Sequence, residues 1–311
     1  MALLLMGALQ LGMLYAMMAM GVYISFRILN IPDLTVDGSF VAGMAVSVMV
    51  TAAGHPALAV LAAALTGALA GIVTGFLQTK VRIHPILSGI LTMTALYSFN
   101  LFVMGGRANV ALAGAGTLFT AARELTGFTA DVTKLLVIGL FTAGLAAVLA
   151  VLFKTRVGIA IRATGDNEEM VRSSSINADF TKCMGFALGN ACVALSGALL
   201  CQYLSYADVS FGSGMVVVGL ASVIIGEALF GRRGVTLGLI SVILGAAAYQ
   251  IMIAIALKIE LLPAYGLKFL SAAIVAVSLS IPVLRKKASD GARIVRTITR
   301  RNQAGKGGEV R

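Results

Sequence analysis

Long apolar blocks recur along almost the whole chain, and they restrict its fold more than any other feature of the sequence. Most of them approach the ~20 residues with which an α-helix crosses a bilayer. Unpaired backbone groups are costly inside lipid, so such blocks are stable there as helices. We therefore predict an all-α polytopic membrane protein with about nine spans. These are residues 3–26, 39–53, 57–79, 85–104, 135–153, 183–206, 214–230, 234–257 and 267–284.

Composition and charge agree with this prediction. Hydrophobic residues make up 59% of the chain and charged residues 12%, whereas soluble domains are nearer half apolar and a quarter charged. If the chain crosses at every block, most Lys and Arg residues fall on one side, which is expected to be the cytoplasm. This places the N-terminus outside and the C-terminus inside. The net charge of +11 then indicates contact with anionic membrane lipid rather than nucleic acid.

The expected transmembrane domain covers residues 1–284, and residues 285–311 form a basic tail. The tail has no apolar periodicity, so we expect it to be disordered in the cytoplasm. The phosphate-binding loop and the HExxH, CxxC and GxSxG motifs are absent from the sequence. We therefore predict no catalytic residues, no metal site and no cofactor in this chain, and a protein that is not an enzyme.

The second span is short and is preceded by polar residues. Pro32 and Gly38 are expected to interrupt a helix, and Asp33 and Asp37 would be costly in lipid. We predict a broken second helix over residues 28–53, whose unwound middle faces a protein-lined cavity. The alternative is a short loop followed by a short, tilted helix.

Short matches at a nearly constant spacing indicate an internal repeat. The matching pairs are Gly67 with Gly245, Lys80 with Lys258, Pro85 with Pro263, and Asp33-Leu-Thr-Val with Asp208-Val-Ser-Phe. Because the members of a pair fall on opposite sides of the membrane, the sequence predicts inverted halves at about residues 30–104 and 205–284. Many transporters build a central site from such halves. The segment from Asp208 is then a second broken or re-entrant element.

Polar residues near the two breaks are candidates for a translocation path. Carboxylates beside unwound backbone can bind an ammonium group, and helix N-termini can bind a carboxylate. Alternatively, the aspartates only cap the half-helices. Glu227 is either a coupling carboxylate or a partner of Arg232 and Arg233. The expected path residues are Asn30, Asp33, Thr35, Asp37, Asp208, Ser210, Asn100 and Asn190.

The span at residues 57–79 carries a GxxxGxxxG pattern formed by Gly67, Gly71 and Gly75. Small residues at this spacing share one helix face and let another helix approach closely. We therefore expect this face to pack against a neighbouring span.

Residues 154–182 form the longest polar run between two apolar blocks. Asp166 is a possible helix N-cap, and Glu169 completes a D-x-x-E pattern. We expect a helix from Asn167 to about Ser174. Two turns are not stable alone in water, so the helix needs a surface, to which Met170 and Val171 offer apolar side chains. The alternative is a solvated loop.

The same run carries a family resemblance. T-R-V-G-I-A-I-R-A-T-G-D-N, followed by S-I-N-A-D, resembles the coupling loop of bacterial ABC importer permeases of the branched-chain amino acid and ribose type. Gly158, Arg162-Ala163, Asn167 and Ser175-Ile176-Asn177 occupy the positions of that pattern. FRILNIPDLTVDGSF and VIIGEALFG resemble the tryptophan/tyrosine branch.

This resemblance implies the permease subunit of an ABC importer for a small polar solute, an amino acid or a derivative, in a bacterial inner membrane. It implies two ABC ATPase subunits that bind ATP, an extracytoplasmic solute-binding protein, and a second permease copy or a paralogue. The coupling residues would be Arg162, Asp166, Asn167, Glu168, Glu169, Met170 and Ile176.

Two other functions fit the residues. An ion-coupled secondary transporter would use Asp33, Asp37 or Glu227 as ion ligands. A membrane anchor or assembly subunit would have no transport path.

Overall fold

The protein is a bundle of long helices. The computed structural model describes residues 2–231, 234–258, 269, 272, 273 and 276, and the following account concerns these residues. The α-helices are α1 (Ala2–Val22), α2 (Thr35–Ala52), α3 (Pro56–Thr79), α4 (Pro85–Val103), α5 (Leu118–Thr126), α6 (Ala130–Leu152), α7 (Arg156–Asp166), α8 (Glu168–Ser173), α9 (Ala178–Leu204), α10 (Met215–Phe230) and α11 (Val235–Lys258). A π-helix, η1 (Tyr23–Ile28), extends α1. A 3₁₀-helix, η2 (Val209–Gly212), precedes α10.

Within the described residues, eight helices are long and apolar enough to cross a membrane. They coincide with the first eight expected spans, so the prediction of an all-α polytopic membrane protein is confirmed. The ninth expected span, residues 267–284, lies outside the described residues apart from four isolated positions, and the expected tail lies wholly outside them.

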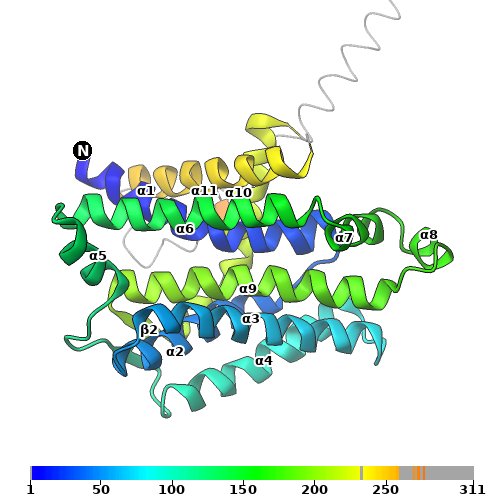
Figure 1. Cartoon of the computed structure of the whole chain (residues 1–311), viewed down its shortest axis with the longest axis horizontal. Helices are drawn as coiled ribbons and strands as arrows, with labels where there is room; N and C mark the ends of the chain where they lie inside the picture. The colour runs from blue at the N-terminus through cyan, green and yellow to red at the C-terminus, as the bar shows by residue number, and fades with distance from the viewer. Residues whose placement is uncertain (1, 232–233, 259–268, 270–271, 274–275, 277–311) are drawn as a thin grey trace, which may run out of the picture.

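Two antiparallel helices, α1 and α9, form the centre of the bundle (Figure 1). Helix α9 packs on α1, α2 and α3, whereas α1 packs on α9, α10 and α11. The first apolar helix of each half of the chain therefore lies against the second and third helices of the other half. Most residues of α9 are buried, although its sequence is less apolar than that of α6.

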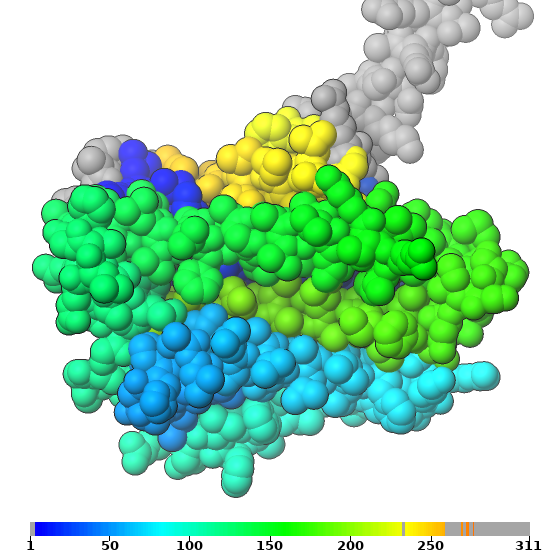
Figure 2. Space-filling model, in the orientation of Figure 1, coloured from blue at the N-terminus to red at the C-terminus, as the bar shows by residue number. Residues whose placement is uncertain are grey.

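The outer helices expose apolar side chains. Figure 2 shows α6 lying across one face of the molecule, with α9 visible between α6 and α3. Soluble proteins rarely expose large contiguous apolar surfaces, and such a surface is expected where a helix faces lipid. Exposed large apolar side chains on α3, α4 and α6 include Leu61, Leu65, Leu69, Phe102, Leu140 and Val151.

The prediction that the α3 glycine face packs against another helix is confirmed, and that helix is α9. A β-carbon added at Gly71 would collide with the backbone of Phe186, and one at Gly67 would collide with the carbonyl oxygen of Asn190. One at Gly75 would lie 2.8 Å from the Cα of Cys183. The α3–α9 contact therefore requires glycine.

The expected break in the second span is only partly correct. The chain is irregular between η1 and Thr35, but α2 is a continuous helix that contains both Asp37 and Gly38. Glycine inside a helix costs about 1 kcal/mol relative to alanine. Here Gly38 packs so closely on Leu96 and Met93 of α4 that a larger residue would crowd them. Helix packing therefore overrides the break that the sequence suggested.

The two ends of the bundle differ in structure. At one end, strand β1 (Asn109–Ala111) pairs antiparallel with β2 (Tyr206–Asp208), which joins segments far apart in the sequence. Helix α5 lies at the same end, whereas α7 and α8 lie at the opposite end (Figure 1). The long helices between them separate the two sets of polar segments.

We expect Gly71→Leu to destabilise the protein by at least about 1–3 kcal/mol, because overpacking a helix contact forces the backbones apart. Gly144→Leu is the matched control, since Gly144 on α6 has open space around it. Thermal unfolding of the purified protein in detergent measures both variants. Equal melting temperatures for the two would contradict the assigned contact.

Candidate functional site

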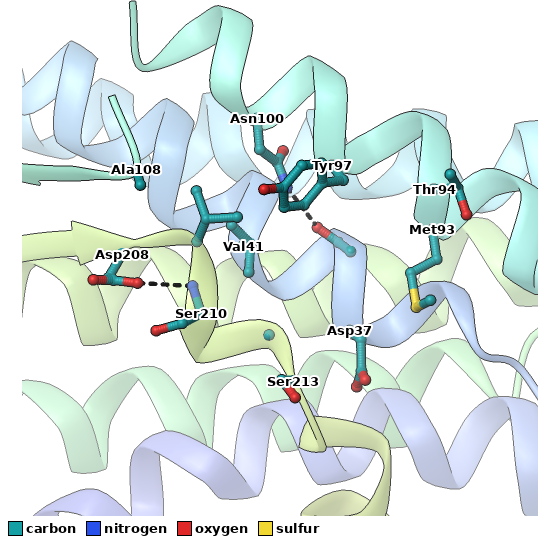
Figure 3. A pocket seen from close by; sticks show the side chains of 13 residues that line it. Asp37, Val41, Met93, Thr94, Tyr97, Asn100, Ala108, Asp208, Ser210 and Ser213 are labelled. Carbon is teal, nitrogen blue, oxygen red and sulfur yellow. Dashed lines mark hydrogen bonds between the residues drawn. The ribbon is translucent and has the colours of Figure 1, made fainter. Parts of the chain in front are cut away.

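A cavity of about 630 Å³ lies between α2, α4 and the segment that runs from β2 through η2 (Figure 3). Its lining includes Asp208 of β2, at the end of the bundle that carries the β1–β2 pair. Four expected path residues line it, whereas the other four lie elsewhere. The lining residues are Asp37, Gly38, Val41, Met93, Thr94, Tyr97, Asn100, Ala108, Asp208, Val209, Ser210, Gly212 and Ser213.

Asp37 connects this cavity to the start of α10. Its Oδ2 accepts a hydrogen bond from the backbone N–H of Gly214 at 3.1 Å, and its Oδ1 accepts one from Val216 at 2.8 Å. The first N–H groups of a helix have no partner within the helix and carry a partial positive charge. A carboxylate of α2 therefore caps α10.

Asp208 lies where β2 meets η2. Its Oδ1 accepts a hydrogen bond from the backbone N–H of Ser210 at 2.7 Å, and its Oδ2 accepts one from the Asn109 side chain at 2.9 Å. The bonds from Ser210 and Asn109 outweigh the effect of partial burial and hold the pKa of Asp208 below its ordinary value. Asp208 is therefore ionised at neutral pH.

Asn100 is an unusual lining residue, because half of its amide has no partner. Its Nδ2 donates to the carbonyl oxygen of Gly38 at 3.3 Å. Its side chain is almost fully buried, yet its Oδ1 has no hydrogen-bond partner. A buried polar atom without a partner costs about 1–3 kcal/mol, and the surrounding protein closes this oxygen off from the solvent in the cavity.

Three lining residues of α4 were not among the expected path residues: Met93, Thr94 and Tyr97. Met93, Tyr97 and Asn100 are separated by four and three positions, so they lie on one face of the helix. This spacing was available in the sequence. In an apolar span, however, any packed helix face has the same spacing. Only the position of η2 shows that this face of α4 lines a cavity.

A second group of expected path residues forms a buried polar cluster outside the lining of that cavity. Asp33 accepts hydrogen bonds from the backbone N–H of Thr35 at 2.9 Å and from the Asn190 side chain at 2.7 Å. The Thr35 hydroxyl lies 2.7 Å from that of Thr74 on α3. This cluster joins the start of α2 to α3 and α9.

The last expected path residue, Asn30, lies at the other end of the bundle in a polar pocket of about 300 Å³. Arg162 and Asp166 from α7 line the same pocket. Here Glu227 forms an ion pair with Arg27 at 2.6 Å. This contact supports the ion-pair interpretation of Glu227, with Arg27 as the partner. The two partners expected from the sequence, Arg232 and Arg233, lie outside the described residues.

The polar run forms two helices instead of one. Helix α7 occupies its first part and ends at Asp166, so the prediction of Asp166 as an N-cap was wrong. Asn167 caps α8 instead, because its side-chain oxygen accepts the backbone N–H of Met170 at 3.0 Å. Among the expected coupling residues, Glu168 is half-buried and the others are exposed, including Met170 and Ile176.

An ionic network ties α8 to α9 and to the end of α3. Glu168 pairs with Lys182 and with Arg172, which also pairs with Asp179, and Lys80 pairs with Asp179. Burial alone would raise the pKa of Glu168, but the hydrogen bonds from Lys182 and Arg172 outweigh it and lower that pKa. In the described part of the chain, no group of three His, Cys, Asp or Glu residues is placed to hold a metal ion.

Helix α7 contacts the irregular segment before α2. Gly165 packs so closely on the backbone of Ile28 and Leu29 that a β-carbon there would collide with it. The side chain of Asn30 donates a hydrogen bond to the carbonyl oxygen of Gly165 at 3.1 Å. Helix α7 is therefore directly connected to the chain that enters α2.

Comparison with known proteins agrees with the resemblance noted in the sequence. The family model for the permease component of branched-chain amino acid transport systems matches residues 4–278. A tyrosine transport system permease protein of Clostridioides difficile (strain R20291) is 34% identical over 265 residues, which cover 85% of this chain and 86% of that protein. An uncharacterized protein of Rickettsia prowazekii (strain Madrid E) is 32% identical over 225 residues, 72% of this chain and 76% of that protein.

An autoinducer 2 import system permease protein of Salmonella typhimurium is 28% identical over 180 residues, which cover 58% of this chain and 50% of that protein. No solved structure matches the chain. The family is one of transport permeases and not of enzymes. With eight apolar helices among its described residues and a family match over nearly its whole length, this chain is a multi-pass membrane protein that belongs to the branched-chain amino acid transport system permease family.

Proposed function

We propose that this chain is the transmembrane subunit of an ABC importer, which moves a small polar solute across the bacterial inner membrane. A separate ATPase binds ATP and docks on α7 and α8, and a solute-binding protein delivers the solute at the opposite end. The observation that carries the proposal is the continuous set of contacts from the exposed helices α7 and α8 to the start of α2.

The docking surface consists of the exposed residues of α7 and α8 and of Ile176, which lies just after α8. Met170 is 53% exposed and Ile176 39% exposed, although both are apolar. The next residue of α8, Val171, is buried, and the ionic network holds α8 against α9. An apolar surface of this kind on an anchored helix is suited to a groove in a partner protein.

Movement of α7 would reach the transport path through α2. Gly165 and Asn30 connect α7 to the irregular segment, and Asp33 connects that segment to α9. Helix α2 then extends to the cavity, where Asp37 holds the start of α10. A shift of α7 would therefore change the shape of the cavity through packed and hydrogen-bonded groups.

The solute is an amino acid or a derivative of one. This part of the proposal is supported by the similarity to a tyrosine transport system permease and by the carboxylate, amide and hydroxyl side chains among the residues that line the larger cavity. The similarity to an autoinducer 2 import permease indicates that related chains serve other solutes. A second permease copy or a paralogue would complete the pore.

We also propose that the two halves of the chain are inverted repeats, with the N-terminus outside and the cytoplasmic end at α7 and α8. Helices α10 and α11 follow α9 as α2 and α3 follow α1, with similar lengths. Asp33 and Asp208 each accept the backbone N–H of the residue two positions later. Corresponding backbone contacts in two halves are expected from a repeat.

Ion-coupled transport is less well supported. Asp33 and Asp37 accept backbone hydrogen bonds, and Glu227 forms an ion pair with Arg27. Groups that are already engaged in structural contacts make poor ligands for a transported ion. ATP-dependent uptake that persists without an ion gradient would distinguish the two functions.

We expect Met170→Asp to weaken binding of the ATPase about tenfold or more, because a charge would enter an apolar contact. Co-purification of the two subunits and ATP-dependent uptake into proteoliposomes measure the effect. Leu125→Asp is the control, since Leu125 is 88% exposed on α5 at the opposite end. Normal ATPase binding by the Met170 variant would contradict the docking surface.

We expect Asn30→Gly to lower the amount of solute transported per ATP hydrolysed several-fold while the ATPase stays bound. Asn30 has φ = 55°, a left-handed conformation that glycine adopts readily, so the variant removes mainly the bond to Gly165. Ser205→Gly is the control, because Ser205 has φ = 63° at the opposite end. Unchanged coupling in the Asn30 variant would show that this contact does not transmit movement.

A further inference from the structure

The polar pocket at the α7 end of the bundle contains four charged side chains. It has a volume of about 300 Å³ and lies between η1, α7, the end of α10 and the start of α11. Arg27 and Glu227 form an ion pair at 2.6 Å, so their charges largely cancel. The charges of the other two, Arg162 and Asp166, therefore decide which ligand fits the pocket.

Arg162 and Asp166 offer opposite charges to a ligand. They lie four positions apart, on one face of α7. Both line the pocket and are exposed, and neither has an ion-pair partner among the residues that the structure describes. A ligand that carries both an anionic and a cationic group would satisfy the two side chains at once.

The start of α11 adds hydrogen-bond donors to the same pocket. Helix α11 has 24 residues, and Gly234 and Val235 at its start line the pocket. The first N–H groups of a helix have no partner within the helix, and the helix dipole is positive there. Such a helix end favours an anion, and a phosphate group has enough oxygens to accept from backbone N–H groups and from an arginine together.

Tyr23 independently indicates a ligand that accepts a hydrogen bond. It lines the pocket and is only 7% exposed, yet its hydroxyl has no hydrogen-bond partner in the described part of the chain. A β-carbon added at Gly238 would collide with this hydroxyl, which therefore lies against the first turn of α11. The protein does not close the hydroxyl oxygen off, although it buries the ring. A buried tyrosine usually has a partner for its hydroxyl, and an oxygen of a ligand in the pocket would be one.

The position of the pocket favours a lipid over a soluble ligand. The apolar spans that contain η1, α10 and α11 each have an end at this pocket, which is the level of the lipid headgroups. Phe26, Phe230 and Leu237 are each next in sequence to a lining residue, and they are 38%, 50% and 54% exposed. A polar pocket with exposed apolar neighbours suits a molecule that has a polar head and apolar chains.

We propose that this pocket binds the headgroup of a phospholipid that carries a primary amine, such as phosphatidylethanolamine. The phosphate lies at the start of α11 and accepts hydrogen bonds from Tyr23 and Arg162, whereas the ammonium group pairs with Asp166. The acyl chains lie along the exposed apolar side chains of α10 and α11. This lipid is distinct from the transported solute, and its binding does not depend on the function proposed above. Because α7 supplies both charged side chains, the lipid would also hold α7 beside α11.

Binding of defined lipids to the full-length protein in detergent tests the proposal. Native mass spectrometry gives the fraction of protein with bound lipid at each lipid concentration, and hence an apparent Kd. We expect phosphatidylethanolamine to bind about threefold or more tightly than phosphatidylcholine, whose methylated amine donates no hydrogen bond. Phosphatidylglycerol, which has no cationic group, should also bind more weakly. Equal affinity for the three lipids would overturn the proposal.

Two substitutions test the groups that would bind the phosphate. Tyr23→Phe removes only the hydroxyl and should weaken binding of phosphatidylethanolamine about threefold, the effect of one hydrogen bond. Arg162→Gln should weaken it about fivefold or more, because hydrogen bonds from charged groups are stronger. Arg156→Gln is the matched control, since Arg156 is exposed on α7 but does not line the pocket. Equal affinities of the Arg162 and Arg156 variants would contradict the site.

Asp166→Asn separates recognition of the amine from recognition of the phosphate. It should reduce the preference for phosphatidylethanolamine over phosphatidylcholine and strengthen binding of phosphatidylglycerol, because it removes a carboxylate that repels phosphate. Arg162→Gln should instead weaken binding of all three lipids. A folding defect would weaken all three in both variants, so the contrast identifies the site. An unchanged lipid preference in the Asp166 variant would refute the pairing with the ammonium group.

Water-soluble phosphoethanolamine distinguishes a lipid from a free phosphate compound. It has the same charged groups but no acyl chains, so we expect it not to displace the lipid at equal concentration. Displacement at equal concentration would show that the pocket takes a soluble ligand, against the lipid assignment. These measurements use the permease without the ATPase, so their outcome is independent of the Met170 and Asn30 tests of ATP coupling.

Discussion

A carboxylate within an apolar bundle is stable only where other groups of the protein satisfy it. Asp33 and Asp37 meet this condition with backbone N–H groups at the starts of α2 and α10. The bond between Asp33 and Asn190 also joins α2 to the central helix α9. These contacts determine where α2 and α10 begin and hold them together. The cavity and the contacts that lead to it depend on this arrangement.

Close backbone approach is the other condition for the fold. Helices in lipid associate through van der Waals packing, which small residues strengthen by letting backbones meet. Gly67 and Gly71 bring α3 against α9, and Gly165 brings α7 against the segment before α2. These contacts connect α3 to α9, and α7 to the chain that enters α2. Transport driven from α7 would require such a connection.

The sequence was sufficient to predict the apolar helices and the polar run between the fifth and sixth of them. Both follow from local composition, because a long apolar block needs lipid or a protein core wherever it lies. The glycine pattern of α3 was also readable, since it depends on spacing within one helix. The break expected at Gly38 was wrong because Leu96 and Met93 on another helix stabilise that close packing.

The relations among distant residues were decided by the tertiary structure alone. Sequence spacing gave no indication that Arg27 pairs with Glu227, that Asp37 caps α10, or that the expected path residues separate into a cavity, a buried cluster and a polar pocket. A hydrogen bond or ion pair depends on distance in space and not on separation along the chain. The sequence therefore determined which segments are helices in a membrane, and helix packing determined which polar groups meet.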